Sequence, residues 1–234
     1  MKLFAFDFDK TITFSDTILP VCKYLCREYH SNFSFLLIQL SYLLFRINLI
    51  SSMTFKENII RLLLEGKNIM EIESKVENFF IRNRSELFNT DIVKIIADEK
   101  KLGNKVVIIS SNLNLFINPA KNILNVDDVF ATKVKITRDK AGDSIEGETC
   151  SGFEKAKVIK KYASQFKFDE IISYGDSSGD FEMFKVSDKS YIAEYHFNSV
   201  IDGFLCRFKY LLGKICSKGF EVNFVEFHTE KSSH

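Results

Sequence analysis

Residues 3–11 read Leu-Phe-Ala-Phe-Asp-Phe-Asp-Lys-Thr, an unbroken apolar run that gives way to two acids. The run at 3–6 does not alternate with polar residues, which predicts a strand covered on both faces, as in a parallel sheet. Asp7 and Asp9 follow where this strand ends. Ligands of open α/β sheets bind just beyond the carboxyl ends of the strands, so this stretch indicates both a fold class and the place of a site.

Strands of the same kind recur further along the chain. Largely apolar runs fall at 105–109, 170–174 and 190–193, and helical patterns at 91–101 and 155–166 lie between them. Strands that alternate with helices predict an α/β fold, here a Rossmann-like parallel sheet with right-handed crossovers. A later alternating stretch near Val222 predicts an edge strand.

Residues 16–87 break this alternation. They read as successive helices without a strand signal, and a crossover needs far fewer residues. We therefore expect a helical cap at 16–87, a catalytic core at 1–15 and 88–205, and a C-terminal extension at 206–234 that packs on the core and ends in a frayed tail. The apolar run 33–44 is shorter than the roughly 20 residues of a membrane span. We interpret it as a buried helix, with an interfacial helix as the less favoured alternative.

Composition and charge narrow the function classes. Hydrophobic residues make up 46% of the 234 residues, enough for a packed interior. The net charge is +1, so no overall positive field points to a nucleic-acid partner. The five cysteines are irregularly spaced, which favours reduced thiols over a disulfide framework or zinc site. Asp7 and Asp9 would interrupt the apolar core of a signal peptide. We expect a cytoplasmic protein.

Two acidic pairs follow two different strands. Asp7 and Asp9 end the first, and Asp176 and Asp180 follow a later strand, with Gly175 allowing close backbone approach. The carboxyl ends of parallel strands lie at one edge of a sheet, so both pairs can meet there. Carboxylates packed together are costly unless a cation neutralises them, which indicates Mg²⁺, a hard ion bound by oxygen.

Candidate phosphate-binding groups lie at the other strand ends. Ser110, Ser111 and Asn112 follow the strand at 105–109 and resemble a helix N-terminus, where hydroxyl and N–H groups can hold phosphate oxygens. Lys155 opens the next helix and could neutralise a phosphate. Each feature alone is consistent with a cap, a turn or a solvated lysine. Their order at successive strand ends indicates a site.

These motifs together resemble the haloacid dehalogenase (HAD) superfamily, in particular its phosphoserine-phosphatase-like branch. The matching stretches are 6–11 (Phe-Asp-Phe-Asp-Lys-Thr), 109–111 (Ile-Ser-Ser), Lys155 and 175–180 (Gly-Asp-Ser-Ser-Gly-Asp). The likeness covers the core rather than the helical insertion. It implies a HAD-type core whose inserted helices form a cap over the site.

The resemblance also implies roles for single residues in a Mg²⁺-dependent phosphatase that acts on a small phosphorylated metabolite. Asp7 would attack phosphorus and form an aspartyl-phosphate, and Asp9 would protonate the leaving oxygen. The remaining roles are phosphate binding by Thr11, Ser110, Ser111 and Lys155, metal binding by Asp7, the backbone carbonyl of Asp9 and Asp176, and support by Gly175 and Asp180.

Several alternatives stay open. Lys157 competes with Lys155, which we prefer because the apolar face of the helix then packs behind it. Asp16 and Thr17 are candidates for substrate selection, or Thr17 is simply a helix N-cap. The apolar run of the cap could bind a hydrophobic phosphomonoester or only pack. A phosphotransferase or mutase would share Asp7 and Asp9, and a non-catalytic membrane-surface or scaffold protein could retain the fold. The oligomeric state is open.

Overall fold

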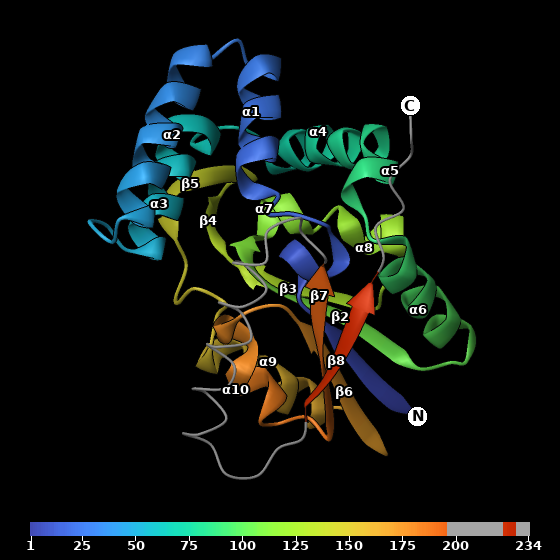
Figure 1. The fold of residues 1–234 in the computed structure, drawn as a ribbon. Helices are drawn as coiled ribbons and strands as arrows, with labels where there is room; N and C mark the ends of the chain where they lie inside the picture. The colour runs from blue at the N-terminus through green and yellow to red at the C-terminus, as the bar shows by residue number, and fades with distance from the viewer. Residues whose placement is uncertain (196–221, 228–234) are drawn as a thin grey trace.

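A six-stranded parallel sheet forms the centre of the computed structural model, which describes residues 1–195 and 222–227 (Figure 1). Its strand order is β3-β2-β1-β6-β7-β8. The strands are β1 (Lys2–Phe6), β2 (Lys105–Leu113), β3 (Asp128–Thr132), β6 (Glu170–Gly175), β7 (Lys189–Tyr195) and β8 (Val222–Phe227). The predicted α/β class with a parallel sheet is confirmed, and the expected edge strand is β8, which pairs with β7.

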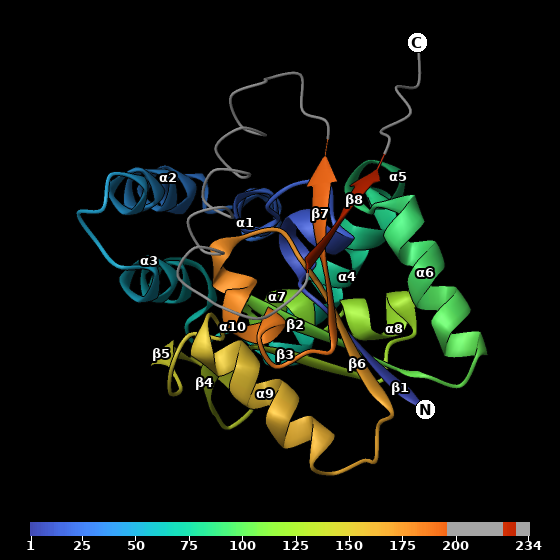
Figure 2. The same cartoon turned by 60° about the horizontal axis from the view of Figure 1, so that its bottom comes forward.

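The sheet is covered on both faces, as the unbroken apolar strands predicted. In β1, Phe4 and Phe6 belong to one hydrophobic cluster while Leu3 and Ala5 belong to another on the opposite face. The helices α6 (Thr90–Lys101) and α8 (Ala120–Leu124) supply side chains to the first cluster. The helices α9 (Phe153–Ala163) and α10 (Phe181–Phe184) supply side chains to the second cluster. Figure 2 shows these two helices together on one side of the sheet.

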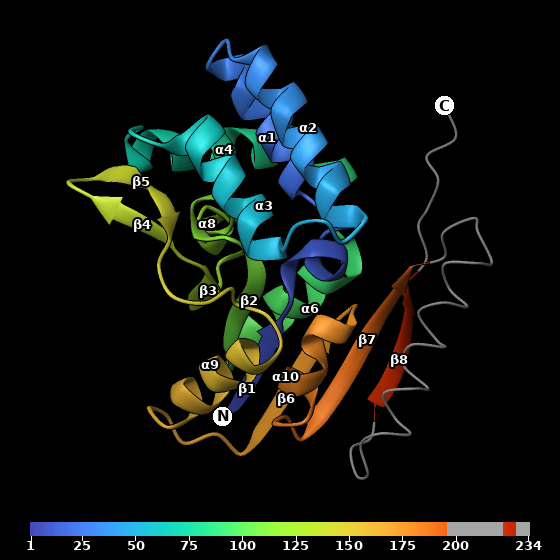
Figure 3. The same cartoon turned by 90° about the vertical axis from the view of Figure 1, so that its left-hand side faces the viewer.

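Helices fill the stretch between β1 and α6. They are α1 (Ile18–Glu28), α2 (Asn32–Arg46), α3 (Ser52–Ile59) continued by a π-helical turn at Ile60–Leu64, α4 (Ile69–Arg82) and α5 (Arg84–Leu87). Asn68 begins α4 by accepting hydrogen bonds from the N–H groups of Met70 and Glu71. These helices lie above the carboxyl edge of the sheet (Figure 3). That they form a separate domain with limits at 16 and 87 stays a prediction. The C-terminal extension at 206–234 and its frayed tail also stay predictions, because residues 196–221 and 228–234 lie outside the described residues.

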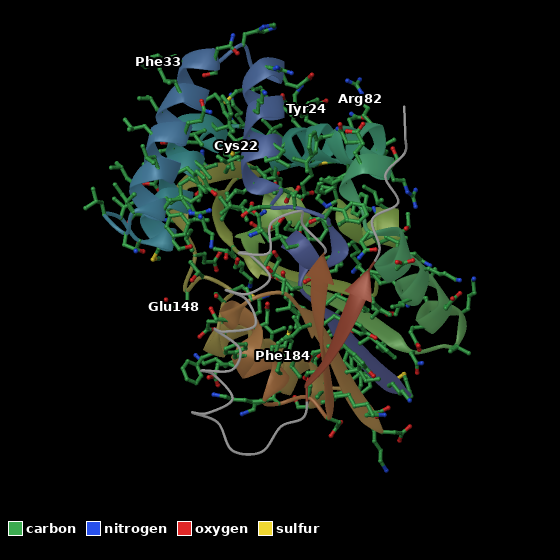
Figure 4. All side chains as sticks on the ribbon, viewed as in Figure 1. Cys22, Tyr24, Phe33, Arg82, Glu148 and Phe184 are labelled. Atoms are coloured by element: carbon green, nitrogen blue, oxygen red, sulfur yellow. The ribbon has the colours of Figure 1, made fainter. Side chains whose placement is uncertain are left out.

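The interpretation of the run 33–44 as a buried helix is wrong. Within α2 only Ile38 and Ser41 are buried, and Ile38 packs in the main hydrophobic cluster. Phe33, Leu36 and Leu40 are more than half exposed. The helix packs on α1 and α3 along one side, and its other side faces outward; Figure 4 shows Phe33 at its outer end. No helix in the part of the chain that the structure describes is both long and apolar enough to cross a bilayer.

Two further features were not predicted. The strand β3 was missed, and an antiparallel hairpin, β4 (Val134–Thr137) and β5 (Lys140–Ile145), follows it. The hairpin contacts the inserted helices, through β5 with α3 and with the π-helical turn at Ile60–Leu64. The N–H of Gly66 donates to the carbonyl of Ala141 at 2.8 Å, and the N–H of Ala141 donates to the carbonyl of Lys67 at 2.9 Å.

Candidate active site

The site lies at the carboxyl ends of β1, β2 and β6. The register places Phe6, the last residue of β1, beside Ile108 on one side and Tyr174 on the other. The next residue is Asp7, whose N–H donates to the carbonyl of Tyr174 at 2.8 Å. The carboxylate of Asp7 therefore leaves the sheet between its two neighbouring strands, where the first and fourth motifs can meet.

A buried lysine joins two of the acids. The Nζ of Lys155 donates to Oδ1 of Asp7 at 2.5 Å and to Oδ1 of Asp180 at 2.6 Å. Lys155 is 2% exposed, Asp7 6% and Asp180 0%. Lys157, in contrast, is exposed and pairs with Glu154. The geometry thus places Lys155, and not Lys157, against Asp7.

Burial and charge act in opposite directions on this ion pair. Desolvation raises the pKa of Asp7 well above its ordinary value, and the ammonium of Lys155 opposes that rise. Desolvation disfavours the charge of Lys155, but the carboxylates of Asp180 and Asp7 outweigh it and raise the lysine pKa. A buried charge is tolerated where partners satisfy it, and here one cation serves two anions.

A third carboxylate makes this a candidate metal centre. Oxygen atoms of Asp7, Asp176 and Asp180 all lie within 4.8 Å of one another. Burial, and then the charge of Asp180, raises the pKa of Asp176 to about 7. Three carboxylates beside one ammonium leave an excess of negative charge, and an all-oxygen donor set fits Mg²⁺. The sequence analysis expected Asp180 only to support the site. In the structure its carboxylate lies in the cluster itself.

Residues outside this cluster hold the side chain of Asp9. Its Oδ1 accepts hydrogen bonds from the N–H of Thr17 at 2.7 Å and from the Thr17 hydroxyl at 2.6 Å. Its Oδ2 accepts from Nδ2 of Asn112 at 2.9 Å. Desolvation, followed by the charge of Asp16, raises the Asp9 pKa to about 6, against the effect of these hydrogen bonds. A carboxyl group with this pKa can exchange a proton near neutral pH.

Two residues therefore have positions that the sequence did not reveal. Asn112 was noted only as a neighbour of the serines, yet it is buried and binds Asp9. Thr17 makes no side-chain cap of α1; it orients Asp9 instead. The exposed Asp16 accepts a hydrogen bond from the N–H of Ile18 at 3.0 Å. Substrate selection by Asp16 or Thr17 stays a prediction.

The second motif lies in a strand, which corrects the expected helix N-terminus. Ser110 and Ser111 belong to β2, at a shift of register against β3, and the next helix, α7 (Asn114–Ile117), begins later. Ser110 is buried, and its hydroxyl accepts a hydrogen bond from the N–H of Asn112 at 3.1 Å. Ser111 is half-buried, and Thr11 is buried in the loop after β1. Phosphate binding by these three hydroxyls stays a prediction.

The fourth motif, residues 175–180, brings backbone and side chain close together at Gly175, as expected. A Cβ on Gly175 would lie 2.6 Å from Cγ of Asp180. The Oδ2 of Asp180 accepts from the N–H groups of Asp176 at 3.2 Å and Ser177 at 3.1 Å. Asp180 therefore holds the loop with one oxygen and Lys155 with the other.

Comparison with known proteins agrees with this geometry. A family model for haloacid dehalogenase-like hydrolases matches residues 4–185. The chain belongs to this family. The resemblance drawn from the four motifs is thereby confirmed, and the matched range runs from β1 to α10.

Individual relatives are distant. The chain is 25% identical over 190 residues to Protein CicA of Caulobacter vibrioides, across 80% of this chain and 83% of that protein. Its fold is similar to that of a protein of unknown function from Bordetella pertussis Tohama I, with a TM-score of 0.73, 15% identity, and coverage of 94% of this chain and 97% of that one. A substrate-bound phosphoserine phosphatase gives a TM-score of 0.58 at 19% identity, with 82% and 85% covered. The fold is thus of the phosphoserine-phosphatase-like type.

Proposed function

We propose that this hydrolase-family protein is a Mg²⁺-dependent phosphatase that cleaves a small phosphomonoester through an aspartyl-phosphate on Asp7. One observation carries the proposal: a buried carboxylate at the end of β1, paired with Lys155 and within 4.8 Å of the carboxylates of Asp176 and Asp180. A phosphate dianion approaching Asp7 meets repulsion unless positive charge is fixed beside it. Lys155 supplies part of that charge in a position set by two hydrogen bonds.

The chemistry divides between the two acids of the first motif. A carboxylate oxygen of Asp7 forms a bond to phosphorus as the bond to the leaving oxygen breaks, and the protonated carboxyl of Asp9 gives its proton to that oxygen. A water molecule then attacks phosphorus, Asp9 takes up its proton, and phosphate leaves Asp7. Bound Mg²⁺, held by Asp7, Asp176 and the backbone carbonyl of Asp9, with Asp180 supporting the site, would neutralise charge on the transferred group.

The surroundings of Asp9 support its role as acid and base. A group that exchanges a proton during turnover works best when its pKa lies near the operating pH, and burial brings Asp9 to about 6. Thr17 and Asn112 hold both oxygens in fixed directions. Small phosphorylated metabolites as substrates and a cytoplasmic location are part of this proposal.

The test is phosphate release from a panel of phosphorylated metabolites, with and without Mg²⁺. Asp7→Asn preserves the shape of the side chain but removes the nucleophile, so we expect no phosphate release and an unchanged circular dichroism spectrum. EDTA should stop the wild-type reaction and added Mg²⁺ should restore it. Full turnover by Asp7→Asn, or turnover that EDTA does not affect, would refute the proposal.

A further inference from the structure

The outward side of α2 presents apolar side chains to solvent. Five of them, spaced three or four residues apart, are 53–72% exposed: Phe33, Leu36, Leu40, Leu43 and Ile47. The half-buried Leu37 and Leu44 lie beside them. At about 100° per residue, these seven positions span about 120° of the helix, and we call them the outer face of α2. The buried Ile38 and Ser41 lie on the opposite side.

The exposed apolar side chains of this protein are concentrated on that helix. Among the described residues thirteen large hydrophobic side chains are exposed, and six of them fall between residues 33 and 49. The chain carries no charge from 31 to 45, and α2 lies at the margin of the molecule (Figure 1). Single exposed hydrophobic residues are normal, but a contiguous patch indicates a surface that makes contact with a partner.

The charges carried by α1 and α2 are mostly positive. Residues 17–52 contain one acid, Glu28, and three exposed cations, Lys23, Arg27 and Arg46. Glu28 is already paired with Lys75, at 3.2 Å. The guanidinium of Arg46 donates to the hydroxyl of Tyr42 at 3.0 Å, so it lies back along α2. An apolar helix face with cations beside it complements a bilayer whose head groups are anionic.

We propose that the outer face of α2 docks on the surface of an anionic lipid bilayer, with the helix parallel to the membrane plane. The 15 residues of α2 extend about 22 Å, less than the roughly 30 Å of a hydrocarbon core. The inner side of α2 is packed on α1 and α3. The helix therefore lies on a bilayer and does not cross it. This inference does not depend on the phosphatase proposal.

A second copy of the chain fits the outer face less well. A specific protein interface buries about 20–30 residues on each side, whereas the outer face and Leu49 together supply eight. A coiled-coil seam usually has charged pairs at its flanking positions, and those positions on α2 include Leu37, Gln39 and Leu44. Two copies would also bring cations together, because the one acid of α1 and α2 is already paired. A bilayer requires only one apolar helix face and basic residues near it.

The test is sedimentation of the full chain with vesicles of phosphatidylcholine, alone or with about one third phosphatidylserine. We expect the wild type to bind the anionic vesicles about tenfold more tightly or better. Leu36→Gln with Leu43→Gln, the outer-face variant, should weaken that binding by about 10- to 100-fold, because the bilayer buries both side chains. Arg27→Gln with Arg46→Gln should remove most of the preference for anionic vesicles, as should high salt.

Ile81→Gln with Leu102→Gln is the matched control. These side chains, on α4 and at the end of α6, are 57% and 73% exposed, and the variant should bind vesicles like the wild type. All three double variants change exposed positions, so their melting temperatures should stay within about 4 °C of the wild type.

Three outcomes would overturn the inference. The first is a wild type that binds neither kind of vesicle. The second is an outer-face variant that binds as tightly as the wild type. The third is a wild-type dimer in sedimentation equilibrium that the outer-face variant dissociates, without binding to vesicles, since a second copy would then cover α2.

Discussion

Gly175→Ala should damage the site without changing any charged group. The added Cβ would lie 2.6 to 2.7 Å from three atoms of Asp180, where carbon atoms need about 3.5 to 4.0 Å. Asp180 must therefore withdraw by about 1 Å. It is fully buried and holds Lys155 at 2.6 Å, so that hydrogen bond stretches or breaks.

The expected losses of stability and of turnover follow from these contacts. Overpacking costs about 1–3 kcal/mol, and a weakened hydrogen bond between charged groups adds about 1–2 kcal/mol. Together they correspond to a fall in melting temperature of roughly 4–20 °C for a chain of this size. Displacement of the groups around Asp7 by about 1 Å should lower the turnover number by about 100-fold.

Gly179→Ala is the matched control, four residues further along the same loop. Its Cβ would lie 3.2 Å from the hydroxyl oxygen of Ser151, which can rotate away, and 3.4 Å from that of Ser177, which is an ordinary van der Waals contact. We expect a change in melting temperature below about 2 °C. Calorimetry and phosphate release measure both effects. If Gly175→Ala melts and turns over like the wild type, the close contact with Asp180 does not constrain the site.

Three other predictions concern the buried charges and the packing of α2. Lys155→Met leaves two carboxylates buried without their cation, so we expect a loss of about 3–5 kcal/mol in denaturant unfolding and no turnover; wild-type stability would contradict the ion-pair argument. In EDTA, Asp9 and Asp176 keep their protons to about pH 6 and 7, respectively, whereas both lose them near pH 4 when unfolded. The folded state then binds more protons, so the melting temperature should fall as the pH rises from about 4 to 7, and a rise would refute this. Ile38→Ala should cost about 2–5 kcal/mol, and Leu40→Ala less than about 1 kcal/mol, because only the first is buried; equal costs would argue against the outward face of α2.

Local sequence patterns predicted the strands of the sheet and the acids that follow them. An apolar strand followed by acids, and its repetition at later strand ends, was enough to place Asp7 and Asp176 at one edge of a parallel sheet. The burial of α2 was not predictable in this way, because an apolar helix has the same composition whether its second face is covered or open. Only the arrangement of α1 and α3 decides that point.

Other features had no signal in the sequence. The hairpin turns at Arg138 and Asp139, both with positive φ, where Asn-Gly or Asp-Gly is the usual indication. The hydrogen bond from Asn112 to Asp9 joins residues 103 positions apart and depends on the register shift in β2.

The hairpin also constrains how the inserted helices can move. Backbone hydrogen bonds join residues 66–69 to 139–141. The inserted helices are therefore linked to the rest of the chain here, as well as at the two points where the backbone enters and leaves them. At those crossings the N–H of Phe14 bonds to Leu87 and that of Asn89 to Ile12. A rigid swing of the helices would have to break the hairpin bonds or carry β4 and β5 along. A swing that keeps these bonds would move two separate stretches of chain, the inserted helices and the hairpin, as one unit.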